Sequence, residues 1–268
     1  MAERRIPEIV IEPPLPGRAI SLYARARAEY PALVEATVQR LREAAADHPG
    51  RIAQATSLGA EDMVLTDLIA RHGIAIDVAM IDTGRLHPET LALRARAEAH
   101  WGIRIAVFGP EPAKVADFER QHGPWPMYDS VALRHTCCGL RKVEPLQRLL
   151  AGRSAWVTGL RRAQSAHRAD VPLRAPDEAG RVKYNPLADW QWADVWHHIA
   201  THGVPYNPLH DAFMPSIGCA PCTRPIAVGE DFRAGRWWWE DDTRRECGLH
   251  VPTANTPSRS TSLSPIQP

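Results

Sequence analysis

Five cysteines are the residues of this sequence whose type and spacing most directly suggest chemistry. Cys219 and Cys222 form a CxxC motif, Cys137 and Cys138 are adjacent, and Cys247 stands alone near the C-terminus. The N-terminal sequence MAERRIPEIVIEPPLPGR lacks the apolar core of a secretory signal, so we expect a reducing, cytoplasmic setting that disfavours disulfides. Four thiolates in that setting favour a metal site, and a tetrahedral sulfur set suits zinc or an iron–sulfur cluster.

Other interpretations of the four paired cysteines stay open at this point. Zinc sites usually draw on two CxxC-like pairs, whereas one pair here is directly adjacent. The CxxC is also compatible with a thioredoxin-like redox motif, although Pro221 lies inside it and no thioredoxin-like context surrounds it. The remaining alternative is buried, unpaired thiols with a chance CxxC.

Cys247 has the surroundings of a reactive thiol. It lies in the stretch ECGLH at the border of a Pro-, Ser- and Thr-rich tail, with Arg244 and Arg245 before it and His250 three residues later. Nearby cations lower the pKa of a thiol, and the thiolate is the nucleophilic form. A nucleophile is therefore the functional interpretation, and an incidental surface cysteine is the alternative.

Two glycine-containing segments, SLGAED (57–62) and DTGRLHPET (82–90), are each expected to join a strand to a helix. Gly59 allows close approach of a ligand to the backbone, and a helix N-terminus offers free N–H groups to an anion or a ribose oxygen. Ordinary capped turns are the alternative for both segments. The GxxxxGK[ST] pattern of a phosphate-binding P-loop is missing, which disfavours ATP hydrolysis of that type.

Basic residues cluster beside these motifs. They are Arg141 and Lys142 after the cysteine pair, Arg161, Arg162 and Arg168 after the WVTG segment, and Arg233 and Arg236 before three consecutive tryptophans. Pairs of charges are usually solvated, but their adjacency to glycine loops and candidate metal ligands favours contact with a small anion. The tryptophan-rich segments predict packing, with DWQWADVWHHI forming a helix laid on a sheet, and no catalytic role.

The elements between these motifs alternate. The hydrophobic spacing predicts helices over 31–47, 60–71, 88–99 and 112–121, and strands over 51–57, 75–81 and 103–108. Strands separated by such helices predict a parallel sheet with helices on both faces. In such sheets ligands bind outside the C-terminal ends of the strands, which is where both glycine segments fall.

Composition sets further bounds. The chain has 268 residues, 44% hydrophobic and 24% charged, with a net charge of +1, so we expect no nucleic-acid partner. No apolar run approaches the roughly 20 residues needed to span a membrane. We expect an N-terminal arm (1–19), an α/β domain for nucleotide and metal (20–232), a flexible catalytic segment (233–250) and a disordered tail (251–268).

Taken together, the segments resemble the assimilatory adenylylsulfate and phosphoadenylylsulfate reductases, over about residues 53–250. The segments that carry the resemblance are SLGAEDMVLTDLI, IDTGRLHPETL, CCGLRKVEPL, WVTGLRRAQSAHR, NPLADWQWADVW, GVPYNPLH, the CxxC and ECGLH. The resemblance implies a Rossmann-like, adenine-nucleotide α-hydrolase-type fold. Ala163 and His167 depart from the family pattern, in which Glu and Thr are usual.

The resemblance also implies residue roles. Cys137, Cys138, Cys219 and Cys222 match the ligands of a [4Fe–4S] cluster, and Cys247 matches the catalytic nucleophile, with Lys142 and His250 beside the phosphosulfate. The positions that match substrate-binding residues are Ser57, Gly59, Asp62, Asp82, Thr83, Gly84, Arg161, Arg162, Arg168, Arg233 and Arg236.

The implied reaction is reduction of adenosine 5′-phosphosulfate to sulfite and AMP through a cysteine S-sulfonate, with thioredoxin or glutaredoxin as the donor. We also expect a homo-oligomer. A phosphoadenylylsulfate reductase is the alternative within the family, but those enzymes generally lack the four paired cysteines. An ATP pyrophosphatase-type adenylyltransferase would carry an SGGxDS-like loop where this chain has SLGAED. A non-enzymatic zinc module would leave Cys247 without a role.

Overall fold

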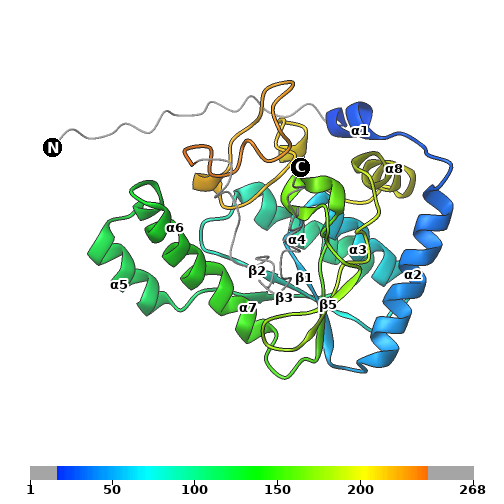
Figure 1. Cartoon of the computed structure of the whole chain (residues 1–268), viewed down its shortest axis with the longest axis horizontal. Helices are drawn as coiled ribbons and strands as arrows, with labels where there is room; N and C mark the ends of the chain where they lie inside the picture. Colours follow the sequence, from blue (N-terminus) through cyan, green and yellow to red (C-terminus); the bar gives the residue numbers. More distant parts are fainter. Residues whose placement is uncertain (1–16, 241–268) are drawn as a thin grey trace, which may run out of the picture.

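A six-stranded, mostly parallel sheet forms the centre of the molecule (Figure 1). The structure is a computed structural model, and it describes residues 17–240. The strands are β1 (Ile52–Thr56), β2 (Asp77–Ile81), β3 (Ile105–Phe108), β4 (Ala155–Val157), β5 (Arg174–Pro176) and β6 (Val182–Tyr184). Their order is β3-β2-β1-β4-β6-β5, and each neighbouring pair is parallel except β5 with β6.

The antiparallel β5 departs from the fully parallel sheet that we expected. It reaches β6 through a short hairpin, and antiparallel strands are the ones that such a connection can join. The Asp177 carboxylate accepts hydrogen bonds from the backbone N–H groups of Ala179 and Arg181, each 2.9 Å long. Gly180 takes a positive φ of 78° at this turn.

Helices cover both faces of the sheet. The α-helices are α1 (Arg18–Tyr23), α2 (Tyr30–Asp47), α3 (Ala60–Arg71), α4 (Pro88–Trp101), α5 (Pro112–His122), α6 (Val131–Cys138), α7 (Glu144–Leu149) and α8 (Trp192–His202). A π-helical turn, η2 (Gly139–Val143), joins α6 to α7. Short 3-10 turns are η1 (Pro126–Tyr128), η3 (Arg162–Gln164), η4 (Ala166–Arg168), η5 (Pro208–His210) and η6 (Ala220–Cys222).

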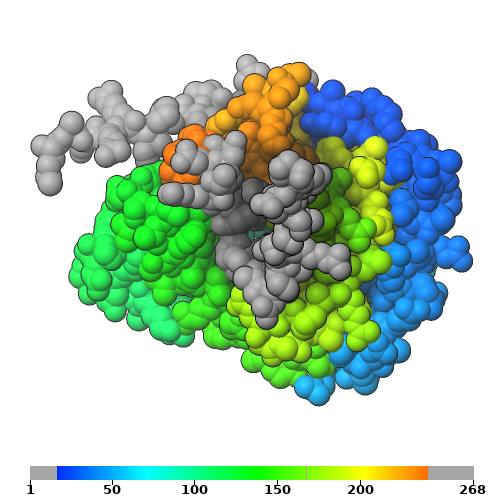
Figure 2. Space-filling view, viewed as in Figure 1, coloured from blue at the N-terminus to red at the C-terminus, as the bar shows by residue number. Residues whose placement is uncertain are grey.

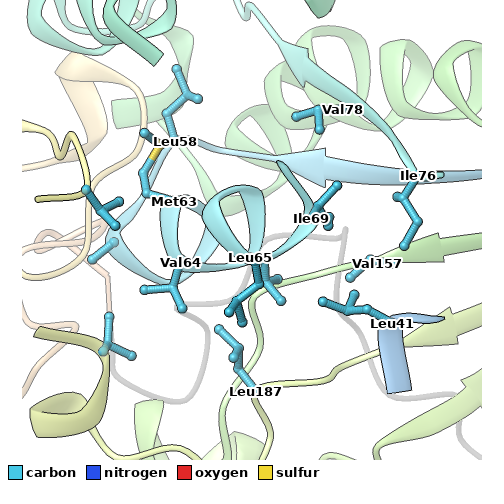
Figure 3. Close-up of a cluster of buried hydrophobic side chains, with 14 of the residues drawn as sticks. Leu41, Leu58, Met63, Val64, Leu65, Ile69, Ile76, Val78, Val157 and Leu187 are labelled. Atoms are coloured by element: carbon cyan, nitrogen blue, oxygen red, sulfur yellow. The ribbon is translucent and has the colours of Figure 1, made fainter. Parts of the chain in front are cut away.

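Alternate residues of β1 explain why both faces are covered. Ile52 points into the larger core, where α2, α3, α4 and α8 pack, and the neighbouring Ala53 points into a second core with Leu146 and Leu149 of α7. Figure 3 shows part of the larger core, in which Val64 and Leu65 of α3 lie close to Leu187. The expected α/β architecture with helices on both faces is thus confirmed.

The structure describes parts of the expected N-terminal arm and of the expected catalytic segment. Arg18 and Ala19, placed in the N-terminal arm, belong to α1, because the Ala19 N–H donates to the Asp211 carboxylate at 2.7 Å and ties the helix to the domain. The segment expected to begin at Arg233 is packed on the domain as far as Glu240, with Trp237 fully buried. The rest of the predicted arm, residues 241–250 of the predicted catalytic segment, and the predicted tail lie outside the described residues.

Within residues 17–240, none of the helices combines the length and the apolar character that crossing a membrane requires.

Candidate functional site

A cavity of about 220 Å³ lies at the C-terminal ends of β1, β2 and β4. In the space-filling view, the green segment and the yellow-green segment lie on opposite sides of the middle of the molecule (Figure 2). Both predicted glycine segments contribute to the cavity wall, as expected for this sheet topology. The predicted substrate residues that line it, together with Lys142, are Ser57, Gly59, Asp62, Thr83, Arg168, Arg233 and Arg236.

The segment before α3 folds around one carboxylate. Asp62 accepts hydrogen bonds from the backbone N–H and the Oγ of Ser57, both at 2.6 Å. Burial raises the pKa of Asp62 to about 6, although the two Ser57 hydrogen bonds oppose this rise. Leu58 adopts a positive φ of 57°, which turns the chain sharply from β1 into α3. The N-terminus of α3 therefore opens onto the cavity with its backbone N–H groups available.

Gly159 makes this close packing possible, and our sequence analysis did not assign it a role. A Cβ at this position would lie 2.5 Å from Oδ1 of Asp62 and 2.9 Å from Cβ of Glu61. The WVTG segment can approach the N-terminus of α3 only because residue 159 has no side chain. The signal in the sequence was its position two residues after the apolar run Ala–Trp–Val that forms β4.

Two predicted substrate residues, Arg161 and Arg162, are not among the residues that line the cavity, and their role in substrate binding stays a prediction. Arg161 is almost fully buried and forms an ion pair of 2.8 Å with Glu61. Arg162 pairs with Asp189 and donates to the Val171 carbonyl at 2.9 Å. Each of the two guanidinium groups therefore has a carboxylate partner within the fold.

Arg168 reaches the cavity within a chain of hydrogen bonds. Its Nη1 donates to Oε1 of Gln164 at 2.6 Å, and Nε2 of Gln164 donates to Glu61 at 2.9 Å. Glu61 also accepts a hydrogen bond from Nε of Arg161 at 2.9 Å. This network fixes one wall of the cavity.

In the segment after β2, Thr83 lines the cavity, whereas Asp82 and Gly84 shape the turn. The Asp82 carboxylate accepts from the Gly84 N–H at 2.9 Å, and Gly84 has a φ of 69°. A Cβ on Gly84 would lie 3.3 Å from Nη1 of Arg141, so this glycine also makes room for that guanidinium. Asp82 and Gly84 thus support the site without forming its surface.

All four paired cysteines line a second, smaller pocket beside the cavity. Cys137 and Cys138 come from the end of α6, Cys219 is the N-cap of η6, and Cys222 is the last residue of that turn. All four are buried, with free thiols. Among the residues that the structure describes, no three His, Cys, Asp or Glu side chains are grouped closely enough to hold one metal ion.

The surroundings of these thiols are cationic. Arg85, Arg134, Arg141 and Lys142 line the same pocket. Burial raises the pKa of Cys222 to about 12, while Lys142 and Arg236 act in the opposite direction. Burial thus favours the protonated form of the Cys222 thiol, and coordination to a metal deprotonates a thiol. A donor set of four thiols that line one pocket among cations fits an anionic thiolate-bound metal centre.

Trp237 connects the cavity to the cysteine pocket, although the sequence analysis gave the tryptophans only a packing role. Its ring lines the cavity and packs against the four cysteines. Three cations surround the ring, with Arg236 at 4.6 Å, Arg134 at 4.8 Å and Lys142 at 5.9 Å from its centre. The only signal in the sequence was its position directly after Arg236 and close behind the CxxC.

The two remaining predicted site residues, Cys247 and His250, lie outside the described residues. The described part of the chain therefore provides the cavity, its cations and the cysteine pocket.

The fold and the site together define an adenine-nucleotide α-hydrolase-like α/β protein. Residues 51–225 match the model of the phosphoadenosine phosphosulfate reductase domain family. The chain belongs to this family, as the motif resemblance indicated.

Several relatives extend the comparison. An adenosine 5′-phosphosulfate reductase of Allochromatium vinosum is 57% identical over 197 residues, covering 73% of this chain and 77% of the relative. One of Rhizobium meliloti is 51% identical over 206 residues, covering 76% and 78%.

Among solved structures, a phosphoadenylyl-sulfate reductase from Candida auris, crystallised as a phosphate complex, is similar with a TM-score of 0.62 at 27% identity. The similarity covers 75% of this chain and 98% of that one. A Candida glabrata FMN adenylyltransferase, at 14% identity and a TM-score of 0.54 over 77% and 70% of the two chains, shares the fold alone.

Proposed function

We propose that this chain reduces adenosine 5′-phosphosulfate to sulfite and AMP in sulfate assimilation. Relatives at 47–57% identity that carry the name adenosine 5′-phosphosulfate reductase support this assignment. The observation that carries it is the placement of Lys142, Arg233 and Arg236 on the wall of a cavity at the strand ends. These cations provide the charge that a phosphosulfate needs, next to a surface that suits a nucleoside.

One side of the cavity suits the nucleoside of this substrate, and the side next to the cysteine pocket suits its phosphosulfate. Ser57 and Gly59 line the cavity beside the N-terminus of α3, and a helix N-terminus is a place where oxygen-rich ligands such as a ribose bind. Lys142 and Arg236 lie around Trp237 on the side that adjoins the cysteine pocket. We therefore place the nucleoside against the strand ends and the phosphosulfate toward the cysteine pocket.

We further propose that Cys137, Cys138, Cys219 and Cys222 hold a [4Fe–4S] cluster. The four thiols line one pocket beside several cations, and four cysteine thiolates are the ligand set that would hold such a cluster. When bound, the cluster supplies fixed charge beside Lys142 and Arg236, which tunes the field at the phosphosulfate. The reaction itself is assigned to the residues of the chain.

The proposed nucleophile is the thiolate of Cys247. It attacks the sulfur of the phosphosulfate, the sulfur–oxygen bond to the phosphate breaks, and AMP leaves with the electron pair of that bond. Lys142, Arg233 and Arg236, with His250, stabilise the negative charge that builds on the leaving phosphate. A thiolate of thioredoxin or glutaredoxin then attacks Sγ of the S-sulfonate and releases sulfite. The second thiol of that donor resolves the mixed disulfide and restores Cys247.

The proposed setting follows from this chemistry. Metal-bound thiolates and a dithiol donor both require a reducing compartment, so we assign the protein to the cytoplasm. We retain a homo-oligomeric assembly as part of the proposal.

The substrate is tested by comparing kcat/KM for adenosine 5′-phosphosulfate with that for its 3′-phosphorylated form. We expect at least a tenfold preference for the unphosphorylated nucleotide, roughly 1.4 kcal/mol. The name of the Candida auris structure makes the 3′-phosphorylated compound the second candidate. A tenfold preference in its favour would refute the choice.

The cofactor is tested by iron, labile sulfide and zinc analysis of anaerobically purified protein. We expect brown protein with iron and sulfide, and loss of iron together with activity when any of the four cysteines is replaced by Ser. Colourless protein with stoichiometric zinc and full activity would contradict the cluster.

A further inference from the structure

One carboxylate on α5 holds two guanidinium groups at the edge of the cysteine pocket. Oε1 of Glu119 accepts a hydrogen bond from Nη2 of Arg85 at 2.6 Å and another from Nη2 of Arg141 at 2.5 Å. Both arginines line that pocket. They belong to different segments, since Arg85 follows β2 and Arg141 lies in the π-helical turn η2.

The segment after β2 is also the surface on which the CxxC rests. The Arg85 carbonyl accepts from the Ala220 N–H at 2.8 Å, and Leu86 pairs with Cys219 in an isolated β-bridge. Oγ1 of Thr83 lies 3.2 Å from Sγ of Cys219. The CxxC half of the cysteine set is therefore positioned through this segment.

The other half of the cysteine set, Cys137 and Cys138, is positioned by α6 and by the π-helical turn η2 that follows it and contains Arg141. Cys137 and Cys138 end α6, directly before the turn that contains Arg141. Nη1 of Arg141 donates to the Thr83 carbonyl at 2.8 Å, which joins this helix to the segment under the CxxC. A single oxygen atom of Glu119 thus contacts both Arg85, in the segment under the CxxC, and Arg141, in the turn after Cys137 and Cys138. The two guanidinium groups hold the pKa of Glu119 below its ordinary value, so this carboxyl is ionised at neutral pH.

We propose that Glu119 is a positioning residue that holds the two halves of the cysteine set at the spacing that a shared metal centre needs. This inference rests on the proposed assignment of the four cysteines to a metal centre. Carboxylates outside the ligand sphere orient metal-binding groups in this way, and their removal typically weakens metal binding about 10- to 100-fold. Glu119 touches neither the cavity nor the thiols themselves in the described structure, so its effect is transmitted through Arg85 and Arg141.

The first test measures release of iron to a chelator, followed by the decay of visible absorption in the holoprotein. Glu119→Ala should accelerate release about 10- to 100-fold. Glu119→Gln, which keeps the size but loses the charge, should have an intermediate effect. The matched control is Glu111→Gln at the start of the same helix, because Glu111 makes only an exposed 3.5 Å pair with Lys114 among the ion pairs of the described residues.

The second test needs no metal. Metal-free protein is treated with a short bifunctional thiol reagent such as dibromobimane, and mass spectrometry measures the yield of cross-links between the peptides of Cys137–Cys138 and Cys219–Cys222. Glu119→Ala and Glu119→Gln should lower this yield relative to wild type, whereas Glu111→Gln should not.

The two tests separate failure of the inference from failure of the proposed cofactor. Wild-type protein without iron, together with a lowered cross-link yield in the Glu119 variants, would refute the cluster and support the positioning role. A cross-link yield in the Glu119 variants equal to that of wild type would overturn the inference, whatever the iron content.

Discussion

The guanidinium group of Arg236 lies 4.6 Å from the centre of the Trp237 ring, and both residues separate the nucleotide cavity from the cysteine pocket. Trp237 is fully buried and adopts a positive φ of 44°, which is strained for a bulky side chain. The backbone N–H of Trp237 donates to the Cys222 carbonyl at 3.3 Å, so the CxxC segment helps to hold Trp237 in this conformation. Backbone strain of this kind persists where the surrounding structure fixes the residue, and it is frequent at functional sites.

The first prediction concerns this ring. Trp237→Leu should lower kcat/KM by about 1–2 kcal/mol, or roughly 5- to 30-fold, because it removes the aromatic face against which Arg236 and Lys142 rest. Trp237→Phe should retain most of the activity. The control is Trp238→Leu, whose ring contacts Trp239 rather than the cations of the cavity wall. Equal effects of the Leu substitutions at 237 and 238 in steady-state assays would argue against the role of the ring.

The second prediction concerns the cations that line the cavity. Alanine at Lys142, Arg233 or Arg236 should each cost on the order of 2–4 kcal/mol in transition-state stabilisation, the range for losing one preorganised charge or donor. Arg162→Ala is the contrast, because Arg162 pairs with Asp189 outside the cavity, and its kcat/KM should stay within a few-fold of wild type. If any of the three cavity variants kept kcat/KM within a few-fold, that residue would not act on the phosphosulfate.

The third prediction is a stability difference that depends on pH. Burial raises the pKa of Asp62 to about 6 in the folded state, above its value in the unfolded chain. The folded protein therefore holds this proton more tightly, and Asp62 destabilises the fold progressively as pH rises through the interval from about 4 to 6. Asp62→Asn removes this cost and keeps an oxygen that accepts from Ser57.

The measurement is the free energy of unfolding in urea at pH 5 and pH 7.5 for both proteins. The stability of Asp62→Asn relative to wild type should be more favourable at pH 7.5 than at pH 5 by roughly 1–2 kcal/mol. The same difference at both pH values would show that the Asp62 carboxyl does not titrate in this range.

The fourth prediction concerns the contact between the WVTG segment and α3. Gly159→Ala places a methyl group 2.5 Å from the Asp62 carboxylate and should cost about 1–3 kcal/mol of folding stability together with nucleotide affinity. Gly139→Ala is the control, since nothing lies within 4 Å of the added Cβ and Ala is a better helix former than Gly. Denaturation curves and equilibrium binding of AMP measure the two effects, and a Gly159→Ala variant that behaves like Gly139→Ala would contradict the close contact.

The sequence was sufficient for the parts of the fold that depend on local pattern. Each of the three strands and four helices expected from hydrophobic spacing is present within about two residues of its expected bounds, for example α3, which begins at Ala60 and ends at Arg71. The hairpin that makes β5 antiparallel also had a local signal in the Asp–Glu–Ala–Gly turn at 177–180, which we did not use. The cavity could be placed because parallel strands end at a common edge of the sheet.

What the sequence could not reveal depends on contacts between distant segments. Arg161 and Arg162 looked alike as neighbouring basic residues, but Glu61, a hundred positions earlier in the chain, pairs with Arg161 in the interior. Likewise nothing near Glu119 indicates that Arg85 and Arg141 meet at its carboxylate. The strained backbone of Trp237 is also set by its packing against the cysteine pocket rather than by its own neighbours in sequence.

The central claim is that the chain transfers a sulfonate from adenosine 5′-phosphosulfate to Cys247, a residue outside the described structure. The most direct measurement is mass spectrometry of protein incubated with sulfur-labelled nucleotide in the absence of any thiol donor. We expect one labelled sulfonate per chain on the peptide that contains Cys247, discharged as sulfite when reduced thioredoxin is added. We also expect that Cys247→Ser keeps its iron, binds nucleotide and acquires no label. Label on another cysteine, or sulfite release at the normal rate by Cys247→Ser, would contradict the account.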